Sequence, residues 1–297
     1  MAAEKKNQNR MQLIRRVHGM VESTDIEKHR QSQDQLGALL SNTKDIRYQE
    51  IFIEEMSGEW VSVTRPHMRK YVILYCHGGG YSTGSSIYAR TLTSKLAMST
   101  SMDVLSFDYR LAPENPFPAA LQDALKAWNY LMLLGYGARD IIIAGDSAGG
   151  NMALAMVLKL KEDKRILPKG LVLMSPWTDL TSSGLTMESK AEIDPVLNWE
   201  YLNRMITAYA EGLDLNNPYI SPLFGDFMDF PPTYIQVGEN ELLLSDAKRL
   251  HKKMADSGVS VKIECFAGMW HVFQMTPFKA AYEAMNKIAE FIFEIAR

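Results

Sequence analysis

The chain has little cysteine, no long apolar run and no block of basic residues. Its 297 residues include two cysteines, Cys76 and Cys265, and each ends an apolar segment typical of a strand. We therefore expect two buried free thiols in a reducing compartment, with a disulfide between them as the less favoured alternative. The net charge is −3 at pH 7. This small charge, without a basic cluster, argues against a nucleic-acid partner.

Two further absences bear on location and chemistry. No segment approaches 18 uncharged apolar residues, so we expect no membrane-spanning helix. Residues 1–20 carry several charges but no apolar core of the kind a secretory signal has, which predicts a cytoplasmic protein. No His-Glu-x-x-His sequence and no paired Cys/His pattern occurs. We therefore expect no metal and no organic cofactor.

What the chain does contain is a short motif between a strand pattern and a helix pattern. Residues 145–149 are Gly-Asp-Ser-Ala-Gly, after the apolar run 141–144 and before a helical pattern from 151. A turn this sharp forces its serine into strained torsions and lifts the hydroxyl to the N-terminus of a helix, where negative charge is favoured. We interpret it as a nucleophile elbow with Ser147 as nucleophile. A plain glycine-rich turn is the alternative.

A second motif supports the elbow. The apolar run 71–76 leads into His-Gly-Gly-Gly at 77–80. Consecutive glycines leave backbone amides free to point at a ligand oxygen, the composition of an oxyanion hole. The expected donors are the amides of Gly79, Gly80 and Ala148, and we expect His77 to anchor the loop. A flexible loop or a phosphate cradle is the alternative, although the Gly-Lys-Ser/Thr ending of a P-loop is missing.

With these motifs the chain resembles the hormone-sensitive-lipase-like carboxylesterases of the α/β-hydrolase fold. The likeness covers about residues 46–297 and rests on His-Gly-Gly-Gly at 77–80, Asp-Tyr-Arg-Leu-Ala-Pro-Glu at 108–114, Gly-Asp-Ser-Ala-Gly-Gly at 145–150, Ser-Pro-Trp at 175–177 and Gly-Met-Trp-His-Val-Phe at 268–273. The resemblance implies a serine carboxylesterase that forms an acyl-enzyme and acts on a small-molecule ester.

The order of apolar patterns predicts an α/β fold. Helical patterns alternate with strands from Tyr71 onward, which indicates a mostly parallel sheet with helices on both faces. The first two strands have no helix between them, which suits an antiparallel edge. We expect eight strands: Ile46–Ile53, Trp60–Thr64, Tyr71–Cys76, Asp103–Phe107, Ile141–Ala144, Gly170–Met174, Thr233–Gln236 and Lys262–Phe266.

Two regions lie outside this alternation. Residues 1–45 contain one or two amphipathic helices, and an insertion at about 178–231 is partly helical and free of strands. An insertion after the sixth strand lies above the carboxyl ends of the strands, where ligands bind in open α/β sheets. We therefore expect the N-terminal helices and this insertion to form a helical cap over a catalytic domain at 46–297, and to close the pocket around short- to medium-chain esters.

A nucleophilic serine needs a base, and His271 is the expected one. It lies in a glycine-containing loop between the last strand and the last helix, in the chain order Ser, acid, His that the fold uses. Four other histidines are expected to be ordinary surface residues, namely His18, His29, His67 and His251.

The acid should follow the sixth or seventh strand. After the seventh strand, Glu-Leu-Leu-Leu-Ser-Asp begins at Glu241 and is similar to the family pattern, in which most members carry Asp at that position. Glu241 is therefore the expected acid. Glu239 and Asp179 remain alternatives, and so does Asp246, although we expect Asp246 to cap the following helix.

Some expectations are less specific. Aromatic residues that we expect near the site are candidates for the acyl or alcohol pocket: Tyr81, Trp177, Phe224 and Phe273. A deacetylase or amidase acting on a natural product would use the same catalytic residues. A noncatalytic receptor of small molecules is a third hypothesis, and the presence of His271 argues against it. The last strand, Val261–Phe266, should be a sheet edge that could pair into a homodimer.

Overall fold

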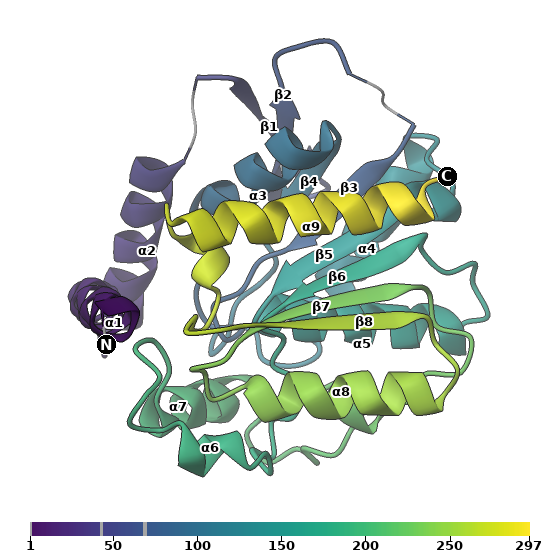
Figure 1. Ribbon diagram of the computed structural model, residues 1–297. Coiled ribbons are helices and arrows are strands. Elements are labelled where there is room, and N and C mark those ends of the chain that lie inside the picture. The colour runs from purple at the N-terminus through teal and green to yellow at the C-terminus, as the bar shows by residue number, and fades with distance from the viewer. Residues whose placement is uncertain (1, 42–43, 68–69) are drawn as a thin grey trace.

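The computed structural model describes residues 2–41, 44–67 and 70–297. One eight-stranded sheet runs between two layers of helices (Figure 1), in the order β1-β2-β4-β3-β5-β6-β7-β8. The strands are β1 (Ile46–Ile53), β2 (Met56–Val63), β3 (Val72–Cys76), β4 (Asp103–Phe107), β5 (Ile141–Asp146), β6 (Gly170–Met174), β7 (Thr233–Gly238) and β8 (Val261–Phe266).

The sheet is antiparallel at its start and parallel elsewhere. β2 pairs antiparallel with both β1 and β4, whereas every other neighbouring pair is parallel. All residues of β3, β4, β5, β6 and β7 are buried, as expected where helices cover both faces of a parallel sheet. The predicted α/β fold with eight strands is therefore confirmed.

Alternate residues along the strands pack against opposite helical layers. Ile73 of β3 clusters with Leu92 of α3 and Ile288 of α9, and its neighbour Leu74 clusters with Trp128 of α4, the period of two that a strand imposes. The helices around the sheet are α3 (Ser86–Thr100), α4 (Ala119–Leu133), α5 (Ala148–Glu162), α8 (Leu244–Asp256) and α9 (Lys279–Ile295), with short 3-10 turns at η1 (Ala138–Asp140), η2 (Pro222–Phe224) and η3 (Phe273–Met275).

Four further helices gather at one end of the sheet (Figure 1): α1 (Ala2–Val21), α2 (Ile26–Leu40), α6 (Thr186–Ser189) and α7 (Trp199–Ala210). Side chains join them across the sequence, since Arg15 donates to the carbonyl of Asp194 at 3.3 Å and Arg204 pairs with Glu22 at 2.9 Å. The division into residues 1–45, 46–297 and the insertion at about 178–231 stays a prediction, and residues 1, 42 and 43 of the first segment lie outside the described residues.

The two cysteines differ in environment. Both are free, Cys76 is buried, and Cys265 is exposed. The prediction of a buried thiol is therefore wrong for Cys265, because β8 is the last strand of the sheet and all of its residues are half-buried or exposed. Across the described ranges, no helix combines the length and the apolar character needed to cross a bilayer.

Candidate active site

Ser147 lies in the strained turn between β5 and α5. Its backbone has φ 53° and ψ −120°, a conformation that L-residues adopt only where surrounding structure enforces it. The flanking glycines allow the chain to close there. A Cβ added to Gly149 would lie 2.0 Å from the carbonyl oxygen of Cys76, and one on Gly145 would lie 2.4 Å from that of Gly149. Only glycine fits at either position, so the sequence of the motif follows from the geometry of the turn.

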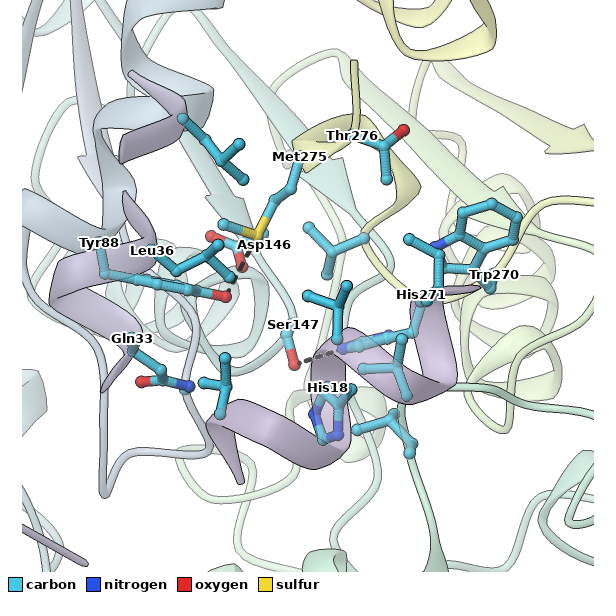
Figure 2. Close-up of a pocket in the computed structure, with 18 of the residues that line it drawn as sticks. His18, Gln33, Leu36, Tyr88, Asp146, Ser147, Trp270, His271, Met275 and Thr276 are labelled. Atoms are coloured by element: carbon cyan, nitrogen blue, oxygen red, sulfur yellow. Dashed lines mark hydrogen bonds between the residues drawn. The ribbon is translucent and has the colours of Figure 1, made fainter. Parts of the chain in front are cut away.

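The hydroxyl of Ser147 faces the imidazole of His271. Nε2 of His271 lies 3.0 Å from Oγ of Ser147 (Figure 2). His271 is on the loop after β8, and both side chains are buried. Burial lowers the pKa of His271 to about 4, although the charges of Asp194 and Asp146 oppose the shift. A histidine with this pKa is neutral at physiological pH and can accept a proton.

The predicted acid, Glu241, lies on the other side of the imidazole. Its Oε2 is 3.7 Å from Nδ1 of His271 and accepts a hydrogen bond of 2.8 Å from the Ser175 hydroxyl. This separation is too long for a hydrogen bond, as is common in enzymes without substrate. Glu241 is fully buried. Burial raises the pKa of its carboxyl to about 8, and hydrogen bonds from Ser175 and the Gly238 backbone oppose the rise.

The three alternative acids have other partners. Glu239 accepts a hydrogen bond of 2.8 Å from the backbone of Gly268, and Asp179 pairs with Arg249 at 2.7 Å. Asp246 does not cap α8, contrary to expectation. It lies in the first turn, within the helix, and its Oδ2 accepts from the backbone N–H groups of residues 178 and 179.

A fourth carboxyl, Asp194, was not among the candidates. It lies in the loop before α7 and is 4% exposed. Its Oδ2 accepts from the Leu242 backbone at 2.9 Å, and Oδ1 accepts from the N–H groups of residues 196 and 197. Burial raises its pKa to about 6, and its charge is the main influence that raises the pKa of His271. In the sequence, Asp194 is followed by proline within the insertion, and this local pattern does not indicate that its carboxyl lies near His271.

The glycine loop after β3 borders the same site. Gly79 and Gly80 have φ of 112° and 61°, values that favour glycine, and both line the cavity beside Ser147. Gly78 is committed elsewhere, because its N–H donates to Asp146 at 2.9 Å. His77 is fully buried, stacks on Tyr109 at 4.1 Å and hydrogen-bonds within the loop. Ala148, the third expected donor, is the first residue of α5.

A cavity of about 380 Å³ opens above Ser147 and His271. Of the predicted pocket residues, Trp177 lines it, whereas Tyr81, Phe224 and Phe273 do not. Tyr81 stacks on Tyr209, Phe224 is partly exposed on η2, and Phe273 packs against Phe266. Tyr81 and Phe273 adjoin the motifs in sequence, but proximity in sequence does not place a side chain in the cavity.

Most of the lining comes from elements that carry no motif. These lining residues are Leu13, Ile14, Val17, His18 and Val21 of α1, Gln33, Leu36 and Leu40 of α2, Tyr88 of α3, residues 196–197 in the loop before α7, Tyr201 and Leu202 of α7, and residues 275–278. Residues 270–272, from the motif at 268–273, complete this side of the cavity. In the described part of the chain, no group of three or more His, Cys, Asp and Glu side chains is arranged to hold a metal ion.

The expectation that four histidines are surface residues is wrong for three of them. His18 lines the cavity, and His29 on α2 is 1% exposed. His67 pairs with Asp103 at 2.7 Å, with 5% of its side chain exposed. His18 is half-buried and the side chains of the other two are buried. The local polar pattern does not show this, because the covering segments are distant in sequence.

An eight-stranded sheet with a strained serine after β5 and a histidine after β8 defines the class of the α/β hydrolases. A family model described as "alpha/beta hydrolase fold" matches residues 73–275. The chain belongs to this family, and within it to the esterases that are similar to hormone-sensitive lipase.

Relatives found by sequence and by structure support the same family. An esterase of Acinetobacter venetianus is 37% identical over 261 residues, which span 87% of this chain and 86% of that one. An acetyl-hydrolase of Streptomyces hygroscopicus is 36% identical over 75% of this chain and 74% of its own. The crystal structure of a hormone-sensitive lipase from a metagenome library superposes with a TM-score of 0.93 at 34% identity, over 98% of both chains. The chain is accordingly an ester hydrolase.

Proposed function

We propose that the chain hydrolyses carboxylic esters with Ser147 as nucleophile, His271 as general base and Glu241 as the acid that orients the imidazole. The observation that carries the assignment is the 3.0 Å contact between Ser147 Oγ and His271 Nε2, at the floor of the cavity. A serine hydroxyl is a weak nucleophile unless a neighbouring base takes its proton, and the lowered pKa keeps His271 in the form that can do so.

The reaction proceeds in two halves. Ser147 Oγ attacks the ester carbonyl carbon as its proton passes to His271 Nε2, and the tetrahedral intermediate collapses when that proton is given to the departing alcohol oxygen. Water then attacks the acyl-enzyme with His271 again as base, which releases the carboxylic acid and restores Ser147. Ionised Glu241 stabilises the imidazolium formed in each half.

The amides of Gly79, Gly80 and Ala148 are the proposed oxyanion donors. In the described residues the N–H groups of Gly79 and Gly80 make no backbone hydrogen bond outside the regular elements, so they are free to meet the oxygen that becomes negative. One such donor is worth roughly 10²- to 10³-fold in rate.

The cap assignment leads to a prediction about chain length. A cavity of about 380 Å³, lined in part by α1, α2 and α7, suits short to medium acyl chains. A series of p-nitrophenyl esters from acetate to palmitate, assayed at saturating and limiting concentrations, tests this. A higher kcat/KM on emulsified long-chain triglyceride than on a soluble short ester would contradict it.

An active-site phosphonate tests the nucleophile directly. It should label Ser147, identified by mass spectrometry of the peptide, and the label should be lost in Ser147→Ala. An unlabelled wild-type protein would instead favour a noncatalytic receptor.

Matched ester and amide substrates separate an esterase from an amidase. Pairing of β8 edges into a homodimer is a further proposal, which light scattering at working concentrations tests.

A further inference from the structure

The guanidinium of Arg30 on α2 uses all five of its N–H donors. Nε donates to the carbonyl of Ser82 at 2.9 Å, and Nη2 donates to the carbonyl of Ala112 at 3.0 Å. The other donors reach two carboxylates, Glu114 at 3.0 and 2.8 Å and Glu27 at 2.6 Å. Among the side chains, only arginine carries five donors in a planar fork. Arg30 therefore joins α2 to the loops after β3 and β4 with bonds that no other residue could make together.

The bond from Arg30 to Ser82 fixes a peptide unit inside the loop after β3. A trans peptide unit is planar, so its C=O and its N–H point in opposite directions. The unit between Ser82 and Thr83 accepts from Arg30 at one end, and its N–H donates to the carbonyl of Gly79 at 2.9 Å at the other. The hydroxyl of Thr83 donates to the same carbonyl at 3.0 Å. Arg30 thus holds in place the groups that bind the Gly79 carbonyl.

A second route leads from Arg30 to the same carbonyl. Ala112, whose carbonyl Arg30 binds, donates its own N–H to the carbonyl of Tyr81 at 2.9 Å. The peptide unit of that carbonyl carries the N–H of Ser82, which donates to the Gly79 carbonyl at 3.1 Å. The position of the Gly79 carbonyl therefore depends on Arg30 through two neighbouring peptide units.

The Gly79 carbonyl shares its peptide unit with the N–H of Gly80, a proposed oxyanion donor. Because the two groups point in opposite directions, a carbonyl held by residues 82 and 83 directs this N–H away from them. Gly79 and Gly80 both line the cavity beside Ser147. Successive hydrogen bonds polarise one another, so the positive charge of Arg30 at one end of the chain favours a negative oxygen at the other end.

We propose that Arg30 positions the oxyanion hole, so that a residue of a cap helix acts on the floor of the cavity. The proposal rests on the catalytic assignment above and adds a residue that touches neither the substrate nor Ser147. Arg30 does not line the cavity, unlike Leu36 on the same helix. Its loss should therefore slow the hydrolysis of all esters alike, whereas a change at a lining residue should distinguish one ester from another.

Arg30→Met keeps an unbranched stem and removes every donor. We expect kcat and kcat/KM to fall by the same factor for p-nitrophenyl acetate and hexanoate, because the weakened interaction exists only in the transition state. The factor should be roughly 10- to 100-fold, since a misplaced oxyanion donor costs less than a deleted one. Arg30→Lys keeps the charge without the fork and should recover part of the rate. Lys28→Met, at an exposed position of α2, is the matched control and should behave as the wild type.

A pair of ketones separates positioning from a purely structural role. Ser147 can add to 1,1,1-trifluoro-2-octanone and form a tetrahedral adduct whose oxygen is negative, whereas 2-octanone binds as the unreacted ketone. The trifluoroketone therefore resembles the transition state, and 2-octanone resembles the ground state. In Arg30→Met the Ki of the trifluoroketone should rise about as far as kcat falls, and the Ki of 2-octanone should stay at its wild-type value.

An equal rise in both Ki values, or a loss confined to KM, would mean that Arg30 only holds the cap helix, and it would overturn the proposal. An unchanged kcat in Arg30→Met would do the same. If Arg30→Met does not fold, Arg30→Lys must show the selective rise in the Ki of the trifluoroketone, or the proposal fails. Failure of the catalytic assignment would differ, because the wild type itself would then bind the two ketones equally.

Discussion

The floor and the roof of the cavity are built from different kinds of contact. In the floor, which comprises the turn after β5 and the loops after β3 and β8, backbone meets backbone: a Cβ on Gly149 would lie 2.0 Å from the Cys76 carbonyl oxygen. In the roof, which comprises α1, α2 and α7, side chains make many of the connections, such as Arg204 with Glu22 at 2.9 Å, and Gly37 of α2 adds a close backbone approach to α3. Positions where backbones touch tolerate almost no residue but glycine, whereas a contact between two side chains can be replaced by another pair of side chains.

We infer from this difference that the floor determines whether an ester is hydrolysed and that the roof determines which ester is preferred. The groups proposed to react lie in the floor, where a misplacement of about 1 Å can cost on the order of 100-fold in rate. The groups that define the far wall, including Gln33 and Leu36, lie in the roof. Changes in the floor should therefore abolish hydrolysis of all esters, and changes in the roof should alter which ester is preferred.

The largest effect should come from the floor. Ser147→Ala removes one oxygen from a buried site and should lower kcat/KM by roughly 10⁴-fold or more. Tm should stay close to that of the wild type, because the turn is retained. Steady-state kinetics and a thermal scan on the same preparation measure both. Retention of a tenth of the activity, with contamination excluded, would refute the nucleophile assignment.

Glu241→Gln should be the next most damaging change. It keeps the volume of the side chain but removes the charge that stabilises the imidazolium, so we expect kcat to fall roughly 10²- to 10⁴-fold with little change in KM. Glu241→Asp keeps the charge and should do less damage. The matched control is Glu239→Gln on the same loop, whose carboxylate bonds Gly268 instead.

The pH profile adds a second measurement on these variants. Burial raises the pKa of Glu241 to about 8, and the ionised form is the one that assists catalysis, so wild-type kcat should rise as pH increases toward 8. Glu241→Gln has no proton to lose and should lack this rise. The acid assignment is wrong if Asp179→Asn or Asp246→Asn is crippling while Glu241→Gln is nearly silent.

A change in the roof should be smaller and selective. In Gly37→Ala the new Cβ would lie 2.6 Å from the backbone of Tyr88, so α2 must shift, at a cost of about 1–3 kcal/mol. We expect kcat/KM to change about tenfold for a hexanoate ester and less than threefold for acetate. Gly19→Ala on α1 is the control, because its Cβ meets nothing within 4 Å. Equal loss on both esters would contradict the separation of floor and roof.

The floor could largely be predicted from the sequence, and the roof could not. Ser147 and the loop of Gly79 and Gly80 are specified locally, because a tight turn or close backbone approach restricts the residues that fit. The positions of the eight strands followed from apolar runs of the right length, whereas their order in the sheet came only from the structure. The chain order of the motifs then indicated His271 and Glu241, without saying how far apart their side chains lie.

The roof depends on pairs of residues far apart in the chain. His18, His29 and Gln33 lie in polar helices whose local pattern predicts exposure. His29 and Gln33 are buried and His18 is half-buried, because α1 and α2 fold over the sheet. Asp194 gives no local signal for the same reason. It touches the loop of Leu242, 48 residues away in sequence. Spacing within one segment does not encode such contacts.

Asp194 joins the two regions and gives the smallest predicted effect. Its side chain binds the Leu242 backbone beside Glu241, and its carbonyl accepts from Arg15 of α1. Because burial raises its pKa to about 6, the carboxylate is charged above that pH and supports the imidazolium of His271. Asp194→Asn should therefore lower kcat about three- to tenfold at pH 8, an effect of roughly 1 kcal/mol.

The pH dependence of the kcat ratio distinguishes an effect of the Asp194 charge from a purely structural role of this residue. As pH falls below about 6, wild-type Asp194 gains a proton and becomes as neutral as asparagine, so the ratio of wild-type to variant kcat should approach one. The lost hydrogen bond to Leu242 should lower Tm at every pH, because asparagine offers only one acceptor oxygen. If the kcat ratio instead stays constant from pH 5 to pH 8, Asp194 acts only by fixing the position of the loop at Leu242, and its charge does not stabilise the imidazolium of His271.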